Sequence, residues 1–224
     1  MLSLAPGVDA ASLRFSEVPD REWERERLAK LKPMHFGNAL WVAPGDTEVE
    51  AQGAVVVRLD PGLAFGTGSH PTTRSCLEWL AGESVVGCRV IDYGCGSGIL
   101  GVAAACLGAR EVLCVDHDPQ ALAATRDNAE RNGVADRLTV RDAKAGVDPQ
   151  ADLLLANILA TTLVQLAPVL AGAVRPGGRA ALSGILPGQA DEVASAYRPW
   201  FGTMRARVRS GWVLLSGART ETMA

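Results

Sequence analysis

The sequence of 224 residues is poor in closely spaced metal ligands. Its three histidines form no H-x-x-x-H pair, and its five cysteines form no C-x-x-C pair. Because protein zinc sites depend on such spacings, we expect no metal site. An odd number of cysteines without a disulfide framework is typical of a chain whose thiols stay reduced, so we expect a cytoplasmic location.

The sequence also lacks an excess of basic residues, a secretory signal and a membrane span. A net charge of −3 argues against broad electrostatic binding to nucleic acid and suits a small ligand or a basic protein partner. The first ten residues contain no basic segment followed by an apolar core, and the uncharged run Tyr93–Ala109 is too rich in glycine to favour a bilayer. We therefore expect no membrane association. Because nothing in the charge pattern demands a partner chain, we also expect a monomer.

From Gly87 onward, segments with the pattern of buried strands alternate with segments of helical periodicity. This alternation predicts an α/β fold with a doubly wound, mainly parallel sheet. The last two strands are separated only by turn residues, which predicts a C-terminal antiparallel hairpin. The predicted strands cover residues 88–94, 111–118, 137–142, 151–158, 179–185, 204–208 and 212–218, and the predicted helices cover 97–109, 119–133, a segment ending at 174, and 189–200.

The part of the chain before this pattern divides into shorter pieces. Residues 1–16 carry no clear periodicity and stay unassigned. Residues 17–53 contain a predicted helix at 20–32, closed by Pro33, and a leading strand at 40–44. A polar stretch then separates them from the main domain, which we place at residues 54–224 and which opens with a strand and a second helix at 72–80.

The loop after the strand at 88–94 is the first candidate binding site. Asp92-x-Gly94-x-Gly96-x-Gly98 has the spacing seen in S-adenosylmethionine-dependent methyltransferases, whereas Gly96-x-Gly98-x-x-Gly101 matches a dinucleotide fingerprint. The strand runs straight into Gly94, which favours the first register. The Asp92 carboxylate would repel a pyrophosphate and attract the α-ammonium of S-adenosylmethionine. An NAD-linked oxidoreductase, which the second register allows, lacks a convincing acid–base partner in the second half of the chain.

Acidic residues end the next two strands. Asp116 stands where a carboxylate commonly accepts hydrogen bonds from both ribose hydroxyls of a nucleotide cofactor, and His117 beside it belongs to the same predicted site. We expect Asp118 to cap the helix that begins at Pro119. Asp142 either binds the adenine amino group or is an exposed turn carboxylate.

A lone amide, Asn157, ends the strand at 151–158 after a run of leucines. In a parallel sheet this strand end faces the ligand crevice. The amide oxygen could accept hydrogen bonds from a substrate amine and orient its lone pair, which makes Asn157 a candidate catalytic residue in an in-line methyl transfer. Alternatively, Asn157 only satisfies backbone groups at the strand end.

A second glycine-rich loop precedes the first one in the chain. Its glycines would let the backbone approach the cofactor and its transferring methyl group, so we predict a second wall of the same site. Phe65 either packs beside the cofactor or pins the loop to the core, and His70 either takes a direct catalytic role or positions the loop. The predicted cofactor contacts in this loop are Phe65, Gly66, Thr67 and Gly68.

Five segments resemble, in order and spacing, the ribosomal protein methyltransferase family known as PrmA. They are LDPGLAFGTGSHPTT (59–73), VIDYGCGSGILG (90–101), VDHDPQAL (115–122), RDNAERNGV (126–134) and LLLANILATTL (153–163). The resemblance extends over residues 17–219, nearly the whole chain, and the first segment is its most specific part.

This resemblance implies a class I methyltransferase fold with S-adenosylmethionine as the methyl donor. It implies that the substrate is protein eleven of the bacterial large ribosomal subunit, methylated on lysine side chains and an α-amino group. It places cofactor contacts at Thr73, Gly94, Asp116 and Asn157, and all four residue types match the family.

Three features depart from the family pattern. Members begin with a small recognition domain that binds the ribosomal protein, whereas about sixteen residues precede the linker-like helix here, too few to fold alone. The linker keeps Trp23 but has Arg27 at the position of a second tryptophan, and His117 stands where an aliphatic residue is usual. We therefore expect an intact catalytic domain that methylates the ribosomal protein or, alternatively, a different protein or small amine.

Overall fold

The computed structural model describes residues 32–45, 47–59 and 68–221. The chain divides into two units, Met1–Leu31 and Lys32–Ala224, and every described residue belongs to the second. The unassigned segment 1–16 and the predicted helix at 20–32, apart from Lys32, therefore lie outside the described residues. The domain start predicted at Ala54 falls inside the second unit.

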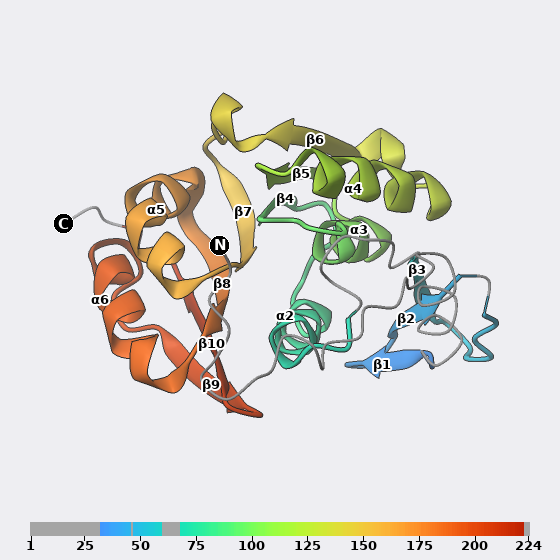
Figure 1. Ribbon diagram of the computed structural model, residues 1–224, viewed down its shortest axis with the longest axis horizontal. Helices are drawn as coiled ribbons and strands as arrows, with labels where there is room; N and C mark the ends of the chain where they lie inside the picture. Colours follow the sequence, from blue (N-terminus) through green and yellow to red (C-terminus); the bar gives the residue numbers. More distant parts are fainter. Residues whose placement is uncertain (1–31, 46, 60–67, 222–224) are drawn as a thin grey trace, which may run out of the picture. The chain divides into compact units, whose positions relative to one another are not determined.

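A seven-stranded sheet forms the centre of this unit (Figure 1). Five strands pair in parallel and the last two pair antiparallel, so the predicted mainly parallel sheet and C-terminal hairpin are confirmed. The order is β6-β5-β4-β7-β8-β10-β9. The strands are β4 (Arg89–Tyr93), β5 (Glu111–Asp116), β6 (Leu138–Asp142), β7 (Ala151–Asn157), β8 (Val174–Ile185), β9 (Arg205–Arg209) and β10 (Trp212–Ala218).

Helices cover both faces of the sheet, because the central strands are apolar on both sides. Leu153 and Leu155 of β7 belong to one core cluster, and Leu154 between them belongs to the other. The first cluster lies under α2 (Pro71–Ala81), α3 (Ile99–Cys106) and α4 (Pro119–Arg131), and the second under α5 (Ala160–Ala173) and α6 (Ala190–Phe201). Short 3-10 helices occupy Ala135–Arg137, Ala143–Ala145 and Pro187–Gln189.

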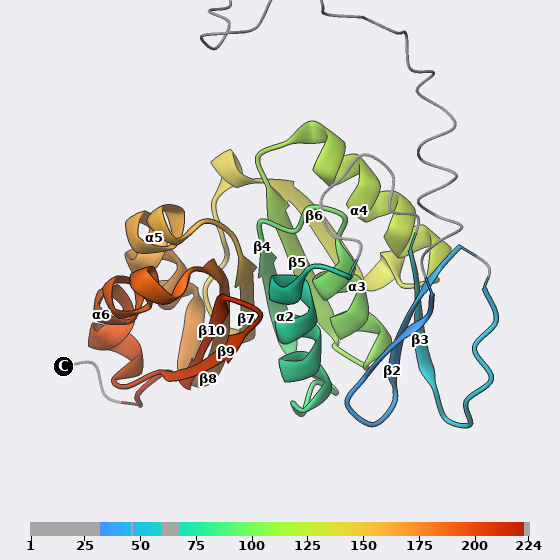
Figure 2. The same cartoon turned by 60° about the horizontal axis from the view of Figure 1, so that its bottom comes forward.

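A small three-stranded sheet precedes the main one. It comprises β1 (Met34–Phe36), β2 (Leu40–Pro44) and β3 (Val55–Leu59), with β2 and β3 parallel. Figure 2 shows β2 beside β3, and β3 contacts both α3 and α4. The sequence predicted β2 and β3 but missed β1, since three residues are too few to show an alternating pattern.

Two backbone details differ from or extend the predicted pattern. The RPGG segment, predicted as a turn before a strand, belongs to β8, and the pairing of β8 with β7 is irregular there. The hairpin between β9 and β10 turns at Ser210 and Gly211, with φ of 46° and 77°. Successive positive φ values match a tight turn whose twist suits an antiparallel hairpin.

Candidate functional site

The carboxyl ends of β4, β5 and β7 meet at one edge of the sheet, and the glycine loop after β4 lies there. Gly94, Gly96 and Gly98 all have positive φ, of 73°, 57° and 77°. Gly98 is the N-cap of α3 and supplies no side-chain cap. Asp92 accepts from the Gly101 N–H in the first turn of this helix, whereas the N–H groups of Ile99 and Leu100 have no acceptor among the described residues and are available to a ligand. Glycine is required at this turn for its backbone conformation.

Gly94 is also required because the end of β7 approaches it closely. A Cβ atom at Gly94 would lie 2.1 Å from Cγ2 of Ile158, the residue that follows Asn157. This contact brings the glycine loop and the tip of β7 together. Because Gly94 has no side chain, the end of β7 that carries Asn157 can lie close to the glycine loop.

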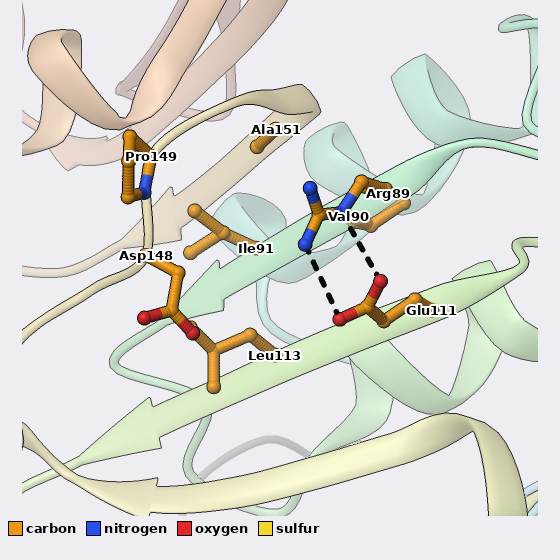
Figure 3. A pocket seen from close by; sticks show the side chains of 8 residues that line it. All are labelled: Arg89, Val90, Ile91, Glu111, Leu113, Asp148, Pro149 and Ala151. Atoms are coloured by element: carbon orange, nitrogen blue, oxygen red, sulfur yellow. Dashed lines mark hydrogen bonds and ion pairs between the residues drawn. The ribbon is translucent and has the colours of Figure 1, made fainter.

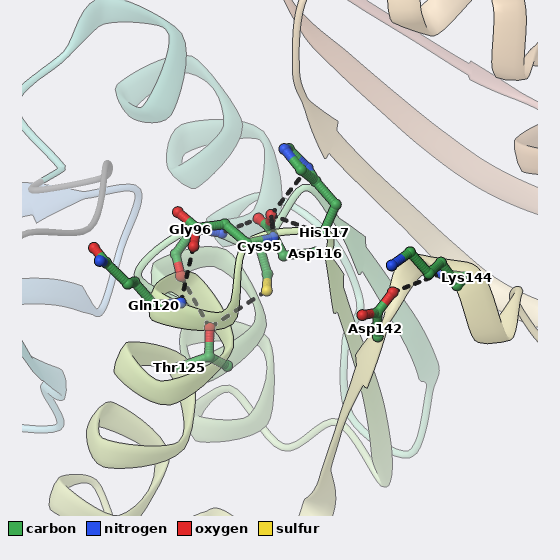
Figure 4. Close-up of polar contacts among 9 residues, drawn as sticks. Cys95, Gly96, Asp116, His117, Gln120, Thr125, Asp142 and Lys144 are labelled. Carbon is green, nitrogen blue, oxygen red and sulfur yellow. Dashed lines mark hydrogen bonds and ion pairs between the residues drawn. The ribbon is translucent and has the colours of Figure 1, made fainter.

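Asp116 at the end of β5 holds the glycine loop through backbone hydrogen bonds (Figure 4). Its Oδ2 accepts from the N–H of Gly96 at 2.9 Å, and its Oδ1 accepts from those of His117 and Asp118 at 2.8 and 3.1 Å. The residue is 9% exposed. A carboxylate has about four acceptor positions, and three are filled by these N–H groups, so Asp116 keeps capacity for about one further donor.

Two residues of α4 that sequence reasoning missed fasten the same loop. The Thr125 hydroxyl donates to the carbonyl of Gly96 at 3.1 Å, and the Asn128 amide donates to the carbonyl of Ser97 at 2.9 Å. Both side chains are buried. The sequence offered one signal for these contacts. Polar residues at 125, 128 and 132 lie on one face of α4, and a face that only met solvent would have no need of amide side chains.

Asp92 differs from its expected position. We expected a carboxylate open to the crevice, but Asp92 is 1% exposed and lies beneath the first turn of α3. Its Oδ2 accepts from the Gly101 N–H at 2.8 Å, and its Oδ1 has no hydrogen-bond partner among the described residues. Burial, with a smaller contribution from the charge of Asp116, raises the pKa of Asp92 to about 7 despite the opposing Gly101 hydrogen bond. The side chain therefore supports the loop from below.

Asn157 and Thr73 connect the tip of β7 with the first turn of α2. The Asn157 Nδ2 donates to the Thr73 hydroxyl at 3.3 Å, across 84 residues of sequence. Thr73 is 1% exposed, while Asn157 is half-buried. With Nδ2 engaged, the amide oxygen of Asn157 is left without a donor among the described residues and is the free acceptor of this pair.

His70 is the N-cap of α2. Its Nδ1 lies 2.7 Å from the Thr72 hydroxyl and 3.4 Å from the Thr72 backbone nitrogen, and its ring packs edge-on against Trp212 at 5.2 Å between centroids. Of the two roles considered for His70, these contacts fit the one in which it positions the loop. A direct catalytic role stays a prediction.

The remaining residues considered for the site fall into four groups. His117 has an exposed side chain with Nδ1 3.4 Å from Asp116 Oδ1. Asp118 caps α4 as predicted. Asp142 caps the 3-10 helix Ala143–Ala145 by accepting from the Lys144 N–H, which fits the turn role of the two roles considered, and adenine binding by Asp142 stays a prediction. Gly68 is buried, and a Cβ there would lie 2.8 Å from Met34 and 3.1 Å from Ile99. The predicted residues Phe65, Gly66 and Thr67 lie outside the described residues.

A hollow at the opposite end of the strands is not part of this site (Figure 3). It lies where β4, β5 and β7 begin, and the Arg89–Glu111 ion pair, with 3.1 Å between Nε and Oε2, lies on its wall. Ligands of open α/β sheets bind at the carboxyl ends instead. Among the described residues, no group of three or more histidine, cysteine, aspartate or glutamate side chains could hold a metal ion. No described helix is long and apolar enough to cross a bilayer.

A family model for "Ribosomal protein L11 methyltransferase (PrmA)" matches residues 2–220. The chain belongs to this family. Among PrmA relatives, the ribosomal protein L11 methyltransferase of Pseudomonas putida strain GB-1 is 51% identical over 219 residues, which are 97% of this chain and 75% of that protein. The relative from Methylococcus capsulatus is 56% identical over 203 residues, 90% of this chain and 69% of that protein.

Solved structures agree with the PrmA assignment. The crystal structure of a ribosomal protein L11 methylase from Lactobacillus delbrueckii subsp. bulgaricus superimposes with a TM-score of 0.74 at 32% identity, covering 85% of this chain and all of that one. An RNA methyltransferase from Salinibacter ruber, solved with S-adenosyl-L-homocysteine, gives a TM-score of 0.53 at 19% identity, covering 67% and 92%. The second likeness concerns the fold alone. The predicted class I methyltransferase fold is therefore confirmed.

Proposed function

We propose that this chain transfers methyl groups from S-adenosylmethionine to amino groups of ribosomal protein L11, on lysine side chains and an α-amino group. Membership of the PrmA family supports the methyltransferase activity and favours L11 over a different protein or small amine. The observation that carries the chemistry is the Asn157–Thr73 pair, which leaves the Asn157 amide oxygen without a donor among the described residues. We place the reaction in the cytoplasm, with the chain acting as a monomer.

The residues at the sheet edge fit the donor molecule. The ribose of S-adenosylmethionine carries two hydroxyl donors, and Asp116, which already accepts from three backbone N–H groups, keeps an acceptor position for about one of them. In the first turn of α3 the N–H groups of Ile99 and Leu100 have no acceptor among the described residues, and they suit the methionine carboxylate. We assign ribose binding to Asp116, with His117 beside it, and binding of the methionine part to Gly94, Gly96 and Gly98. We place Thr73 and Gly68 beside the methyl group of S-adenosylmethionine. The sequence predicts Phe65, Gly66 and Thr67 at the same place.

The donor supplies an electrophilic methyl group on a sulfonium centre, so the protein needs to position a nitrogen lone pair. The Asn157 amide oxygen accepts one N–H of the incoming amine and thereby fixes the direction of its lone pair. Thr73 holds the amide in place through its hydroxyl. His70 keeps Thr72 and the start of α2 in position.

The acceptor must lose a proton before it attacks. A lysine side chain has a pKa of about 10.4 in water, and an environment of low polarity favours its neutral form. The chain from Leu153 to Val174, which contains Asn157, has no charged residue that would retain an ammonium ion. Desolvation by this part of the site therefore favours the neutral amine.

The test compares binding with turnover in Asn157 variants. Calorimetry with S-adenosylmethionine and with NAD identifies the cofactor, and we expect binding of the first only. With L11 as acceptor, Asn157→Ala is expected to lower kcat by about 100-fold through lost positioning and to weaken S-adenosylmethionine binding far less, since Asp116 and the glycine loop supply the other proposed cofactor contacts. Thr161→Ala, an exposed position on α5, serves as the matched control. An unchanged kcat in the Asn157 variant would remove this residue from the reaction.

A further inference from the structure

The carboxyl edge of the sheet is divided by charge. On the cofactor side, β5 and β6 end in Asp116 and Asp142. On the other side, the chain carries no charged residue from Leu153 to Val174 or from Ala180 to Ala190. These two uncharged stretches contain the ends of β7 and β8 and the segments that follow them. A charged group of a substrate finds no complementary side chain within them.

Two leucines in these segments are exposed. Leu159, two residues after Asn157, is 71% exposed, and Leu186, three residues after Ser183, is 46% exposed. Single exposed apolar residues are ordinary. Here, however, both follow neighbouring strands at the edge that holds the proposed acceptor site, and both lie within the two stretches without charge.

The backbone places the two segments together. Asn157 and Ser183 are register partners on β7 and β8. Just beyond them, Gly184 has a φ of +85°, and a Cβ atom there would lie 2.1 Å from the carbonyl oxygen of Ile158. Only glycine permits this approach. The chain therefore emerges from both strands side by side, with Leu159 and Leu186 following at the same edge.

We propose that Leu159 and Leu186 form an apolar rim that binds an uncharged, apolar side chain flanking the acceptor amine in the substrate polypeptide. This inference rests on the proposed function and deepens it. The amine lies at Asn157, so the residue next to it in a polypeptide reaches the chain segments that follow Asn157 and Ser183. Covering the exposed leucines removes apolar surface from water, which favours an apolar neighbour over a charged one.

The first test measures methyl transfer to L11 by Leu159→Ser, by Leu186→Ser and by the double variant. We expect kcat/KM for L11 to fall by about tenfold in the double variant, mainly through KM, with S-adenosylmethionine affinity unchanged. Leu159→Met, in contrast to Leu159→Ser, should keep most of the wild-type kcat/KM, because methionine keeps the apolar contact. Val86→Ser and Val169→Ser, which change valines 79% and 49% exposed, are the matched controls and should leave kcat/KM unchanged.

The second test is a double-mutant cycle with the substrate. Once mass spectrometry locates the methylated residues of L11, the apolar residue flanking one of them is changed to serine. We expect this change to lower methylation of that residue by the wild-type enzyme but to have little further effect with the Leu159→Ser/Leu186→Ser enzyme. Additive losses, or equal losses in the valine controls, would overturn the inference. Failure of the wild-type chain to methylate L11 at all, despite binding S-adenosylmethionine, would instead remove the proposed function and the inference with it.

Discussion

Asp92 is a carboxyl group that lies buried beneath the glycine loop, where its charged form is not solvated by water. One of its oxygens accepts from the Gly101 N–H, and the other has no partner among the described residues. Burial is the main reason that its pKa rises from 3.8 to about 7. The folded state therefore holds a proton that the unfolded state releases at lower pH.

This proton makes stability depend on pH. Between the unfolded pKa and the folded value of about 7, the folded state binds more protons, so the free energy of unfolding falls as pH rises through this window. Asp92→Asn keeps an acceptor for Gly101 and carries no charge. The quantity to follow is the free energy of unfolding of the variant minus that of the wild type. We expect this difference to be roughly 1–3 kcal/mol more favourable to the variant above the window than at acid pH. Urea unfolding of the cofactor-free proteins across pH measures this difference, and parallel pH profiles would contradict the account.

At the scale of secondary-structure elements, α4 connects the glycine loop with β3 of the small sheet. Thr125 and Asn128 fasten the glycine loop, as described above. Asn132, at the end of the same helix, accepts from the backbone N–H of Arg58 in β3 and donates to its carbonyl, both at 2.7 Å. The side chain thereby continues the hydrogen-bond pattern of the small sheet at its edge.

Removing this connection should destabilise the protein. Asn132→Ala leaves both backbone groups of Arg58 without this partner, and we expect a loss of about 1–3 kcal/mol in the free energy of unfolding. Glu130→Ala, an exposed change on the same helix, should stay within about 0.5 kcal/mol of wild type. Denaturant titration compares the two. Equal stability of the two variants would mean that the Asn132 connection contributes nothing.

The elements themselves were largely predictable from the sequence, for physical reasons. Short apolar runs that alternate with helical segments mark the parallel strands, and proline at the first position marks the start of α2 and α4. The start of β8 was mistaken, because a Pro-Gly-Gly segment normally turns the chain and here pairing with β7 extends through it. Local signals cannot show such pairing across the sheet.

Prediction of the site was less complete. The sequence indicated which residues stand at strand ends, and the structure brings the tip of β7 against the glycine loop through Gly94 and Ile158. It did not show that Asp92 turns under the loop, because a strand residue next to a turn can face either side. It also gave no role to Thr125 or Asn128, whose partners are backbone carbonyls about thirty residues away.

At the scale of the whole molecule, we propose that one edge of the sheet serves two different tasks. The acidic ends of β5 and β6 suit a nucleotide cofactor, and the uncharged ends of β7 and β8 suit a neutral amine. Asn157 stands where the two halves meet, since β7 lies between β4 and β8. The chain covers 75% of the length of the Pseudomonas putida relative. Methylation of L11 is therefore best tested with this chain rather than with the longer relative.

The most direct measurement is the intact mass of purified ribosomal protein L11 after incubation with this chain and S-adenosylmethionine. Our account predicts an increase by whole methyl groups, located by fragmentation on lysine side chains or the α-amino group, and absent when S-adenosylmethionine is omitted. An unchanged L11 mass, from a chain that calorimetry shows to bind S-adenosylmethionine, would contradict the proposed activity.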